Sequence, residues 1–272
     1  MKNLVKSLIV ISAMIFLFSS CNSDDKEEQT SVKVVLTDGP FPFNFATHAN
    51  VGIAKIELKK ENGVYVTVFA GSENYNMVTL TNGDTADVET STLDAGTYTE
   101  ARVTFNAANI ALSNGNTFEA NVNNNAHVVS IDPVLVVNEG ENSEILFDLD
   151  LDNSFSFMNT FNLPFSGWIS SIDAISGCHF QPHLRACDFH QTGEIKGTVN
   201  VDGNLFEGAD VSIVVNGNTI HTHSESDGTF KFIGIKAGTY TVSTTTQDNG
   251  SVQVGEIVVT ANGTATCSVE IN

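Results

Sequence analysis

Basic side chains are scarce in this sequence: 12 lysines and arginines stand against 32 aspartates and glutamates, a formal net charge of -20 at pH 7. A field of that sign repels polyanions, which excludes nucleic acid and anionic lipid as partners. The sequence also lacks the Gly-x-Ser-x-Gly and His-Glu-x-x-His motifs and any phosphate-cradling glycine loop. We therefore expect a protein that is not an enzyme.

The N-terminus has the pattern of a secretory signal. Lys2 and Lys6 precede an apolar run from Leu8 to Phe18, about half of the roughly 20 residues that a membrane-spanning helix needs. Cys21 then follows small residues, as in a bacterial lipoprotein signal, where this cysteine receives the lipid, palmitate included. The alternative is a plain signal with Cys21 in a core, which the charged residues after it disfavour. We expect residues 1–20 to be removed and Cys21 to be the lipidation site.

The residues after Cys21 are strongly acidic. The run from Ser23 to Glu28 reads Ser-Asp-Asp-Lys-Glu-Glu. It resembles the export signal by which lipoproteins of the Bacteroidota reach the outer face of the outer membrane. The alternative is a solvated spacer that like-charge repulsion keeps extended. Residues 21–30 are thus predicted to form an acidic tether of an outer-membrane lipoprotein displayed on the cell surface, with the membrane as partner through the lipid anchor.

The rest of the chain has the composition of an all-β protein. Hydrophobic residues make up 41% of the sequence, enough for a packed core. Asn, Thr, Val and Gly are abundant and apolar residues alternate in short runs, which favours strands. Asn62-Gly63 and Asn114-Gly115 are hairpin signals, and 128–137 is expected to pair with 144–151 around the turn 138–141. We predict two tandem β-sandwich domains, residues 31–189 and 190–272.

An ordered set of stretches in the first domain resembles an uncharacterised domain family of bacterial lipoproteins. That family opens on a Leu-Thr-Asp-Ala-Pro strand and closes on a Lys-Pro-Val-Ile-Arg-Ala strand. The corresponding stretches are Val34–Pro40, Ala54–Leu58, Leu93–Tyr98 with Arg102, Leu146–Asp150 and Gln181–Ala186. The resemblance covers about residues 31–188 and implies fold and location rather than chemistry, because the family has no established activity. The chain departs from it after Asp38 and over 154–177, where individual specificity is expected.

A second set of stretches resembles the carboxypeptidase regulatory-like domain. They are Gly193–Val199, Leu205–Val211, Ser226–Phe230 and Ile235–Val242. This resemblance implies a seven-stranded, transthyretin-like sandwich without catalytic residues, used as a structural or binding appendage. The sequence Ala-Gly-Thr-Tyr-Thr occurs at Ala95 and again at Ala237. We expect both domains to use the same turn into a strand there.

The four cysteines become an odd number once Cys21 is lipidated. Cys267 alternates with Val269 and Ile271 and is expected to be a buried free thiol. Cys178 and Cys187 are candidates for a disulfide, although their spacing alone does not show that the two Cα atoms approach each other. With His179, His183 and His190, the same two thiols would alternatively offer ligands suited to zinc.

Carboxylates and histidines offer further candidates for metal ligation. Asp148, Asp150 and Asp152 alternate along one predicted strand, and three such carboxylates repel one another unless they are solvated or bind a hard cation such as Ca²⁺. The series lacks the bidentate glutamate and turn glycine of an EF-hand. His221 and His223 also share a strand face. No cofactor is expected, with Ca²⁺ at the three aspartates as the alternative.

Aromatic side chains suggest ligand binding more directly. Phe41, Phe43 and Phe45 occupy one loop, and the sole tryptophan, Trp168, lies in the lengthened segment near the end of the first domain. They either plug the ends of the sandwich core or form an exposed platform for a sugar ring or a protein. The sequence thus favours a non-catalytic binding or adhesion module for a glycan or surface protein. The alternative is a structural or assembly subunit of an envelope complex, and a metal-dependent hydrolase is the least supported.

Overall fold

The computed structural model describes residues 30–38, 45–123, 126–159, 172–246 and 250–271, and most of them lie in strands. The predicted signal, Cys21 and nearly all of the tether lie outside the described residues, as do Phe41, Phe43 and Trp168. Within the described ranges, no helix has the length and apolar character needed to cross a membrane. The chain is all-β, as the composition and alternation predicted.

The first domain contains eleven strands and three short helices or turns. Its elements are β1 (Ser31–Thr37), β2 (Ala46–Lys60), β3 (Tyr65–Asn76), η1 (Met77–Thr79), β4 (Ala86–Thr92), β5 (Gly96–Leu112), β6 (Thr117–Glu119), β7 (His127–Val137), β8 (Asn142–Leu149), α1 (Leu151–Ser154), β9 (Phe155–Asn159), η2 (Ile172–Ala174), β10 (Ile175–Phe180) and β11 (Leu184–Asp188). Nine of the strands form one sheet in the order β3-β2-β5-β7-β11-β8-β1-β4, with β6 added beside β5. The strands β9 and β10 form a separate pair.

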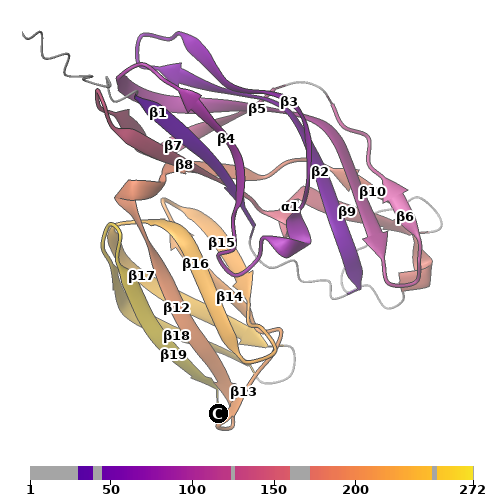
Figure 1. The fold of residues 1–272 in the computed structure, drawn as a ribbon. Coiled ribbons are helices and arrows are strands. Elements are labelled where there is room, and N and C mark those ends of the chain that lie inside the picture. The colour runs from indigo at the N-terminus through magenta and orange to yellow at the C-terminus, as the bar shows by residue number, and fades with distance from the viewer. Residues whose placement is uncertain (1–29, 39–44, 124–125, 160–171, 247–249, 272) are drawn as a thin grey trace, which may run out of the picture.

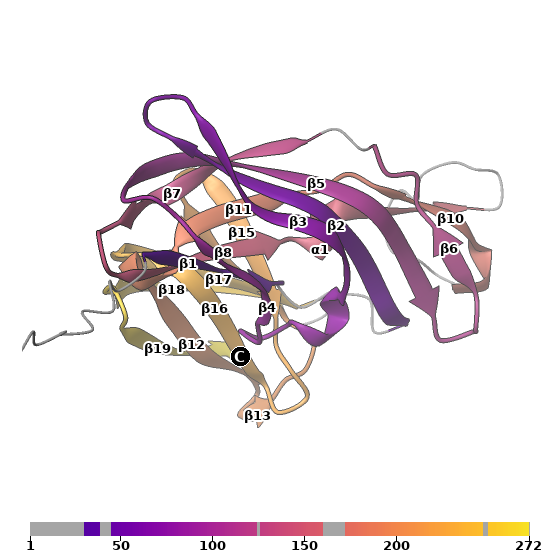
Figure 2. The same cartoon turned by 45° about the horizontal axis from the view of Figure 1, so that its top comes forward.

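The large sheet folds over so that its two ends meet. Ser91 of β4 donates from Oγ to the main-chain oxygen of Val68 in β3, over 2.6 Å. The apolar faces of the two halves enclose one core, with Tyr98 and Phe147 among its largest fully buried side chains. In Figure 1 this domain forms the upper part of the molecule, and in Figure 2 its layer of β2, β3 and β5 lies above that of β1, β4 and β8. Closing the sheet in this way leaves few unpaired strand edges.

Hairpin turns fall where the sequence predicted them. Gly63 between β2 and β3 has φ +88°, and Gly115 between β5 and β6 also has φ +88°. Only glycine adopts this left-handed backbone without steric cost, which is why Asn-Gly pairs mark these turns. The predicted pairings of these two hairpins are therefore confirmed.

The predicted pairing of β7 with β8 is wrong. Both hydrogen-bonding edges of β8 are already taken, by β1 in parallel and by β11 in antiparallel orientation. Strand β11 lies between the two and contacts β7 through Ala186 and Ile131. The strand also ends earlier than expected, at Leu149, because Asp150 leaves the sheet and caps α1 by accepting from the backbone N–H of Asn153 over 3.0 Å.

The second domain is a sandwich of two four-stranded sheets. After η3 (Phe189–Gln191) it comprises β12 (Thr192–Val201), β13 (Asn204–Leu205), β14 (Asp210–Val215), β15 (Asn218–His223), β16 (Thr229–Lys236), β17 (Gly238–Thr246), β18 (Gly250–Val259) and β19 (Thr264–Ile271). One sheet joins β12 to β13, β16 and β19, and the other has the order β15-β14-β17-β18. The count is eight strands, one more than the resemblance implied, and β13 is only two residues long. Figure 2 shows this domain packed beneath the first.

The two Ala-Gly-Thr-Tyr-Thr stretches share one structural device. The Tyr98 hydroxyl donates to the carbonyl of Asp94 over 2.9 Å, and the Tyr240 hydroxyl donates to the carbonyl of Lys236 over 2.6 Å. In each domain a tyrosine therefore ties its strand to the residue four positions earlier, much as a tyrosine corner does in other sandwiches. The expectation of a common turn is met in this form.

Replacing Tyr98 by phenylalanine is expected to lower the free energy of unfolding by about 1 kcal/mol, because it removes one hydrogen bond from a buried ring and leaves a carbonyl without its donor. Urea denaturation of the whole chain measures the loss. Tyr75→Phe is the matched control, since its hydroxyl has no hydrogen bond within the described residues. Equal effects of the two substitutions would show that the hydrogen bond contributes nothing.

Candidate functional site at the domain junction

The two domains meet without an intervening linker. Strand β11 ends at Asp188, and β12 of the second domain begins at Thr192, after the single turn of η3. Val35, Leu146 and Cys187 of the first domain form a buried apolar cluster with Ile233 of the second. The domain boundary is therefore a packed interface rather than an exposed hinge.

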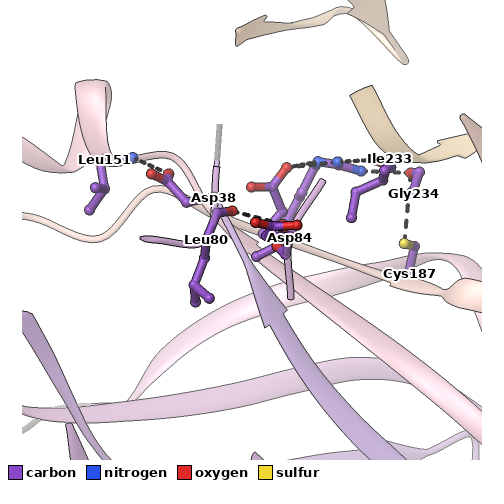
Figure 3. A network of polar contacts seen from close by, with 10 residues as sticks. Asp38, Leu80, Asp84, Leu151, Cys187, Ile233 and Gly234 are labelled. Carbon is purple, nitrogen blue, oxygen red and sulfur yellow. Dashed lines mark hydrogen bonds and ion pairs between the residues drawn. The ribbon is translucent and has the colours of Figure 1, made fainter. Parts of the chain in front are cut away.

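Arg185 reaches across this interface. It stands opposite Asp148 in the antiparallel pairing of β11 with β8, and its Nε donates to Asp148 Oδ2 over 2.7 Å. Its Nη1 donates to the carbonyl of Gly234 and its Nη2 to that of Ile233, each over 2.6 Å. In Figure 3 dashed lines mark the contacts made by Ile233 and Gly234. Burial tends to lower the pKa of Arg185, but Asp148 raises it, so the guanidinium stays charged.

Gly234 allows this close approach. Its φ is +65°, a left-handed conformation that favours glycine. A Cβ at this position would lie 2.5 Å from Leu146 Cδ2 and 3.2 Å from Cys187 Sγ, both in the first domain. The missing side chain therefore brings two carbonyl groups of β16 within reach of Arg185.

Polar contacts at the rim of the junction are more exposed. Lys236 Nζ lies 2.6 Å from Asp132 Oδ1, and Asn216 donates to the other oxygen of the same carboxylate. Their side chains are about two-fifths exposed, 43% for Lys236 and 39% for Asp132. Exposed pairs of this kind contribute little to stability because solvent screens them. The buried contacts of Arg185 are therefore the principal polar link.

A small cavity of about 20 Å³ lies beside Arg185, lined by residues of both domains. Asp38 is in its wall, with Oδ1 accepting from the backbone N–H of Leu151 over 3.1 Å and Oδ2 without a partner. Next to it, the Thr37 hydroxyl donates to the carbonyl of Asp84 over 2.8 Å. Burial raises the pKa of the Asp38 carboxyl well above its usual value, and the charge of Asp148 adds to the shift. Figure 3 shows Asp38 between Leu151 and Asp84 in this network.

The three aspartates singled out in the sequence do not share one side of a strand. Asp148 forms an ion pair with Arg185, Asp150 caps α1, and Asp152 lies inside that helix. Because the strand stops at Leu149, the alternation on which the candidate Ca²⁺ cluster depended is broken. Among the residues that the structure describes, no group of three or more His, Cys, Asp or Glu side chains is arranged to hold a metal ion.

The acidic turn nevertheless faces a histidine of the second domain. His221 Nδ1 lies 2.9 Å from Asp210 Oδ1, and this hydrogen bond raises the pKa of His221. The charges of Asp150 and Asp152 act in the same direction across the junction. The histidine and the aspartates, which the sequence treated separately, therefore belong to one electrostatic environment.

The candidate disulfide is not formed. Cys178 and Cys187 are both buried free thiols, and they contact different carbonyls, those of Phe118 and Gly234. Burial raises the pKa of each thiol to about 12, and that of Cys267 to about 11. A thiolate nucleophile is therefore not available at neutral pH. Among the described residues, these thiols and the histidines near them form no group arranged to hold a metal ion.

Of the candidate ligand-binding aromatics, only Phe45 lies within the described residues. It is half-buried and packs edge-on against Phe157, with ring centroids 5.9 Å apart. Phe155 and Phe180 form a separate tilted pair, with ring centroids 5.0 Å apart. Phe45 thus closes one end of the core, which is the structural alternative that the sequence left open.

A larger crevice of about 300 Å³ opens on the other side of the junction. Its walls come from η3, β12 and the turn before β19, with Glu144 and Ile233 completing it. Glu194 in its wall is held by Lys196 and Lys231. Burial alone would raise the pKa of Glu194, but hydrogen bonds from Lys196, Thr264 and Lys231 lower it to about 2. The charged groups in the wall of the crevice are thus already paired.

One protein-family model matches most of the first domain. Residues 29–162 match the family model described as "Domain of unknown function (DUF4382)". The match overlaps the predicted uncharacterised domain over residues 31–162, and its description carries no activity. No curated protein matches the chain.

Several solved structures of surface proteins share a weak likeness. The Bacillus anthracis TIE protein is 11% identical, with 93% of this chain and 41% of that chain covered and a TM-score of 0.24. BcpA, the major pilin subunit of Bacillus cereus, is 13% identical, with 89% and 70% covered and a TM-score of 0.22. The shaft pilin spaA from Lactobacillus rhamnosus GG (D295N mutant) is 12% identical, with 89% and 97% covered and a TM-score of 0.24. The chain spans less than half of the TIE protein, and TM-scores this low define no common fold.

The residues of the junction come from stretches that the sequence had already marked. Asp38, Asp148 and Arg185 each lie in a different stretch of the family resemblance, more than 100 residues apart at the extremes. Sequence reasoning missed their convergence, because it took the aspartates of 148–152 as one cluster. The available signal was one of the chain's two arginines and two aspartates at or near strand ends, in a chain otherwise poor in basic residues.

Proposed function

We propose that the chain is a non-catalytic lipoprotein of the outer membrane, anchored through Cys21 and displayed on the cell surface, whose two β domains act together as a structural or assembly unit. The observation that carries the proposal is the contact of Arg185 with the carbonyls of Ile233 and Gly234. A buried charge pair and an apolar cluster hold the second domain in one orientation. A subunit that positions partners in an envelope complex needs such a fixed geometry.

The chemistry of the described side chains supports a non-catalytic role. All three thiols in the described residues have raised pKa values. His221 is hydrogen-bonded to Asp210 rather than to a hydroxyl or thiol that it could activate. These residues therefore offer no activated nucleophile.

The assembly role is tested by crosslinking intact cells of the native host and purifying the chain through a C-terminal tag. We expect a defined envelope partner in constant ratio to the tagged chain. A variant with a weakened junction, such as Arg185→Met, is expected to lose that partner while remaining in the membrane fraction. Recovery of the monomer alone from crosslinked cells would contradict the assembly role.

The crevice favours a binding module as a second candidate. Its volume of about 300 Å³ is at the lower end of the range typical of small-molecule pockets. Glycans or a surface protein are the partners that the sequence suggested. Titration of the mature chain against a glycan array tests this role, and the absence of signal on every glycan would rule out the carbohydrate form of it.

The anchor itself is tested by replacing Cys21 with alanine. We expect the variant to lose labelling by radioactive palmitate and to move into the soluble fraction, because no acylated residue remains to hold it in the bilayer. Cys267→Ala is the control and should label like the natural chain. Labelling that survives in Cys21→Ala would place the lipid elsewhere. Protease added to whole cells distinguishes surface display from an inward-facing anchor.

A further inference from the structure

Three buried oxygen atoms that have no hydrogen-bond partner among the described residues belong to side chains lining the small cavity at the junction. They are Asp38 Oδ2, Asp148 Oδ1 and Thr222 Oγ1, on residues that are 3%, 8% and 1% exposed. Buried polar atoms in folded proteins are nearly always hydrogen-bonded, so an exception calls for an explanation. Here two of the three atoms belong to carboxyl groups, and all three residues line one cavity.

The positive side chains near the cavity are engaged elsewhere. Arg185 is committed to the other oxygen of Asp148 and to two carbonyls of β16. Lys231 lies 3.1 Å from Glu194 Oε2. The charges that act on Asp38 are those of Asp148, Asp150 and Asp152, which are all negative. The unpartnered oxygen of Asp38 is therefore left in a negative environment, and nothing in the described contacts of these cations reaches it.

We propose that this cavity binds one hard, oxygen-seeking cation, held by Asp38 Oδ2 and Asp148 Oδ1 with the Thr222 hydroxyl as a neutral third ligand. The proposal is independent of the assembly role. A volume of about 20 Å³ holds one particle of the size of water, so a cation that enters must exchange most of its hydration shell for protein oxygens. Ca²⁺ gives up its water more readily than Mg²⁺, which keeps several water ligands.

The affinity is expected to be low. Three protein oxygens are fewer than the six to eight that Ca²⁺ prefers, so the dissociation constant should lie at about 10⁻⁴–10⁻³ M, as in extracellular calcium modules. The cation would link β1 and β8 of the first domain to β15 of the second. Binding would therefore strengthen the junction between the domains.

The test titrates the full mature chain with CaCl₂ after removal of divalent ions, with MgCl₂ and NaCl in parallel, by calorimetry and thermal unfolding. At a Ca²⁺ concentration one hundred times the dissociation constant, we expect the unfolding midpoint to rise by roughly 5–10 °C. MgCl₂ should give a much smaller rise. No heat and no shift with Ca²⁺ at 10 mM (about ten times the upper expected constant) would overturn the proposal and leave the cavity to water.

Two variants locate the site. Asp38→Asn keeps the acceptor for the Leu151 N–H but loses the charge, and it should abolish the Ca²⁺-dependent rise. Asp152→Asn removes a charge from the same environment without touching the cavity wall, and it should keep most of the rise. Equal losses in both variants would indicate diffuse attraction at an acidic surface, and an unchanged rise in Asp38→Asn would place the ion elsewhere. Either result would refute the site.

A direct observation keeps the proposal testable if Asp38→Asn does not fold. Crystals of the natural chain grown with Ca²⁺ should show an anomalous scattering peak between Asp38 and Asp148. A peak of water-like strength at that position, or a calcium peak only at other carboxylates, would refute the proposal.

Discussion

Replacing Arg185 with methionine is expected to destabilise the chain by roughly 3–5 kcal/mol, more than the loss of any other polar contact at the junction. The side chain of Asp148 is only 11% exposed, so removing its partner leaves a buried carboxylate without a compensating charge. The carbonyls of Ile233 and Gly234 lose their donors in the same step. Urea denaturation of the whole chain measures the effect.

The chain contains a matched control in its other arginine. Arg102 pairs with Glu57 over 2.8 Å on the face of the sheet and stacks on Tyr65, but it lies away from the junction. Arg102→Met should cost less, and the double variant Arg185→Met/Asp148→Asn should recover part of the loss, because both charges are then gone. Losses in Arg185→Met no greater than those in Arg102→Met would show that the buried pair has no special role.

Replacing Gly234 with alanine is expected to cost roughly 2–5 kcal/mol. A left-handed residue other than glycine costs about 1–2 kcal/mol by itself, and overpacking in a filled interior adds about 1–3 kcal/mol. Here the added methyl group would meet Leu146 Cδ2 at 2.5 Å and push β16 away from the first domain. Chemical denaturation gives the loss, and limited proteolysis shows whether the two domains separate first.

A substitution at Gly217 distinguishes the backbone cost from the steric cost. Its φ is +82°, similar to that of Gly234, but a Cβ there would have no neighbour within 4 Å. Gly217→Ala therefore reports the backbone cost alone, about 1–2 kcal/mol. If Gly234→Ala lowers the free energy of unfolding no more than Gly217→Ala does, the close approach of the two domains at Gly234 is not under steric constraint.

Much of the fold follows from local sequence. Alternation of apolar residues predicts strands such as β1, and the Asn-Gly pairs predict the hairpins at Gly63 and Gly115, because both signals depend on neighbouring residues alone. The repeated Ala-Gly-Thr-Tyr-Thr predicts a shared turn for the same reason. Tyr98 and Tyr240 then form equivalent hydrogen bonds in two different sheets.

Pairing between distant strands does not follow from local sequence. Strand β11 inserts between β7 and β8, although the turn at 138–141 connects those two directly. The choice depends on how the whole sheet folds over its core, which no short window records. The same holds for the junction, since Asp38, Asp148 and Arg185 meet only when β1, β8 and β11 lie side by side.

The short helix α1 is a further case. Asp148, Asp150 and Asp152 have the spacing of a strand face, but an aspartate at the end of a strand also caps a helix well. The capping hydrogen bond of Asp150 to Asn153 decides between the two, and it turns Asp152 away from the sheet. Period-two alternation over three polar residues is thus a weak signal where a strand is about to end.

The thiol of Cys187 offers a native probe of how often the domains come apart. Its Sγ lies 3.7 Å from the Gly234 carbonyl and is sealed between the two sandwiches. Alkylation of this sulfur requires the two domains to separate locally. The alkylation rate of Cys187, relative to that of the half-buried Cys267, therefore measures how often the junction opens in the unmodified chain. Mass spectrometry of the alkylated peptides over one time course would then follow this opening without any engineered label.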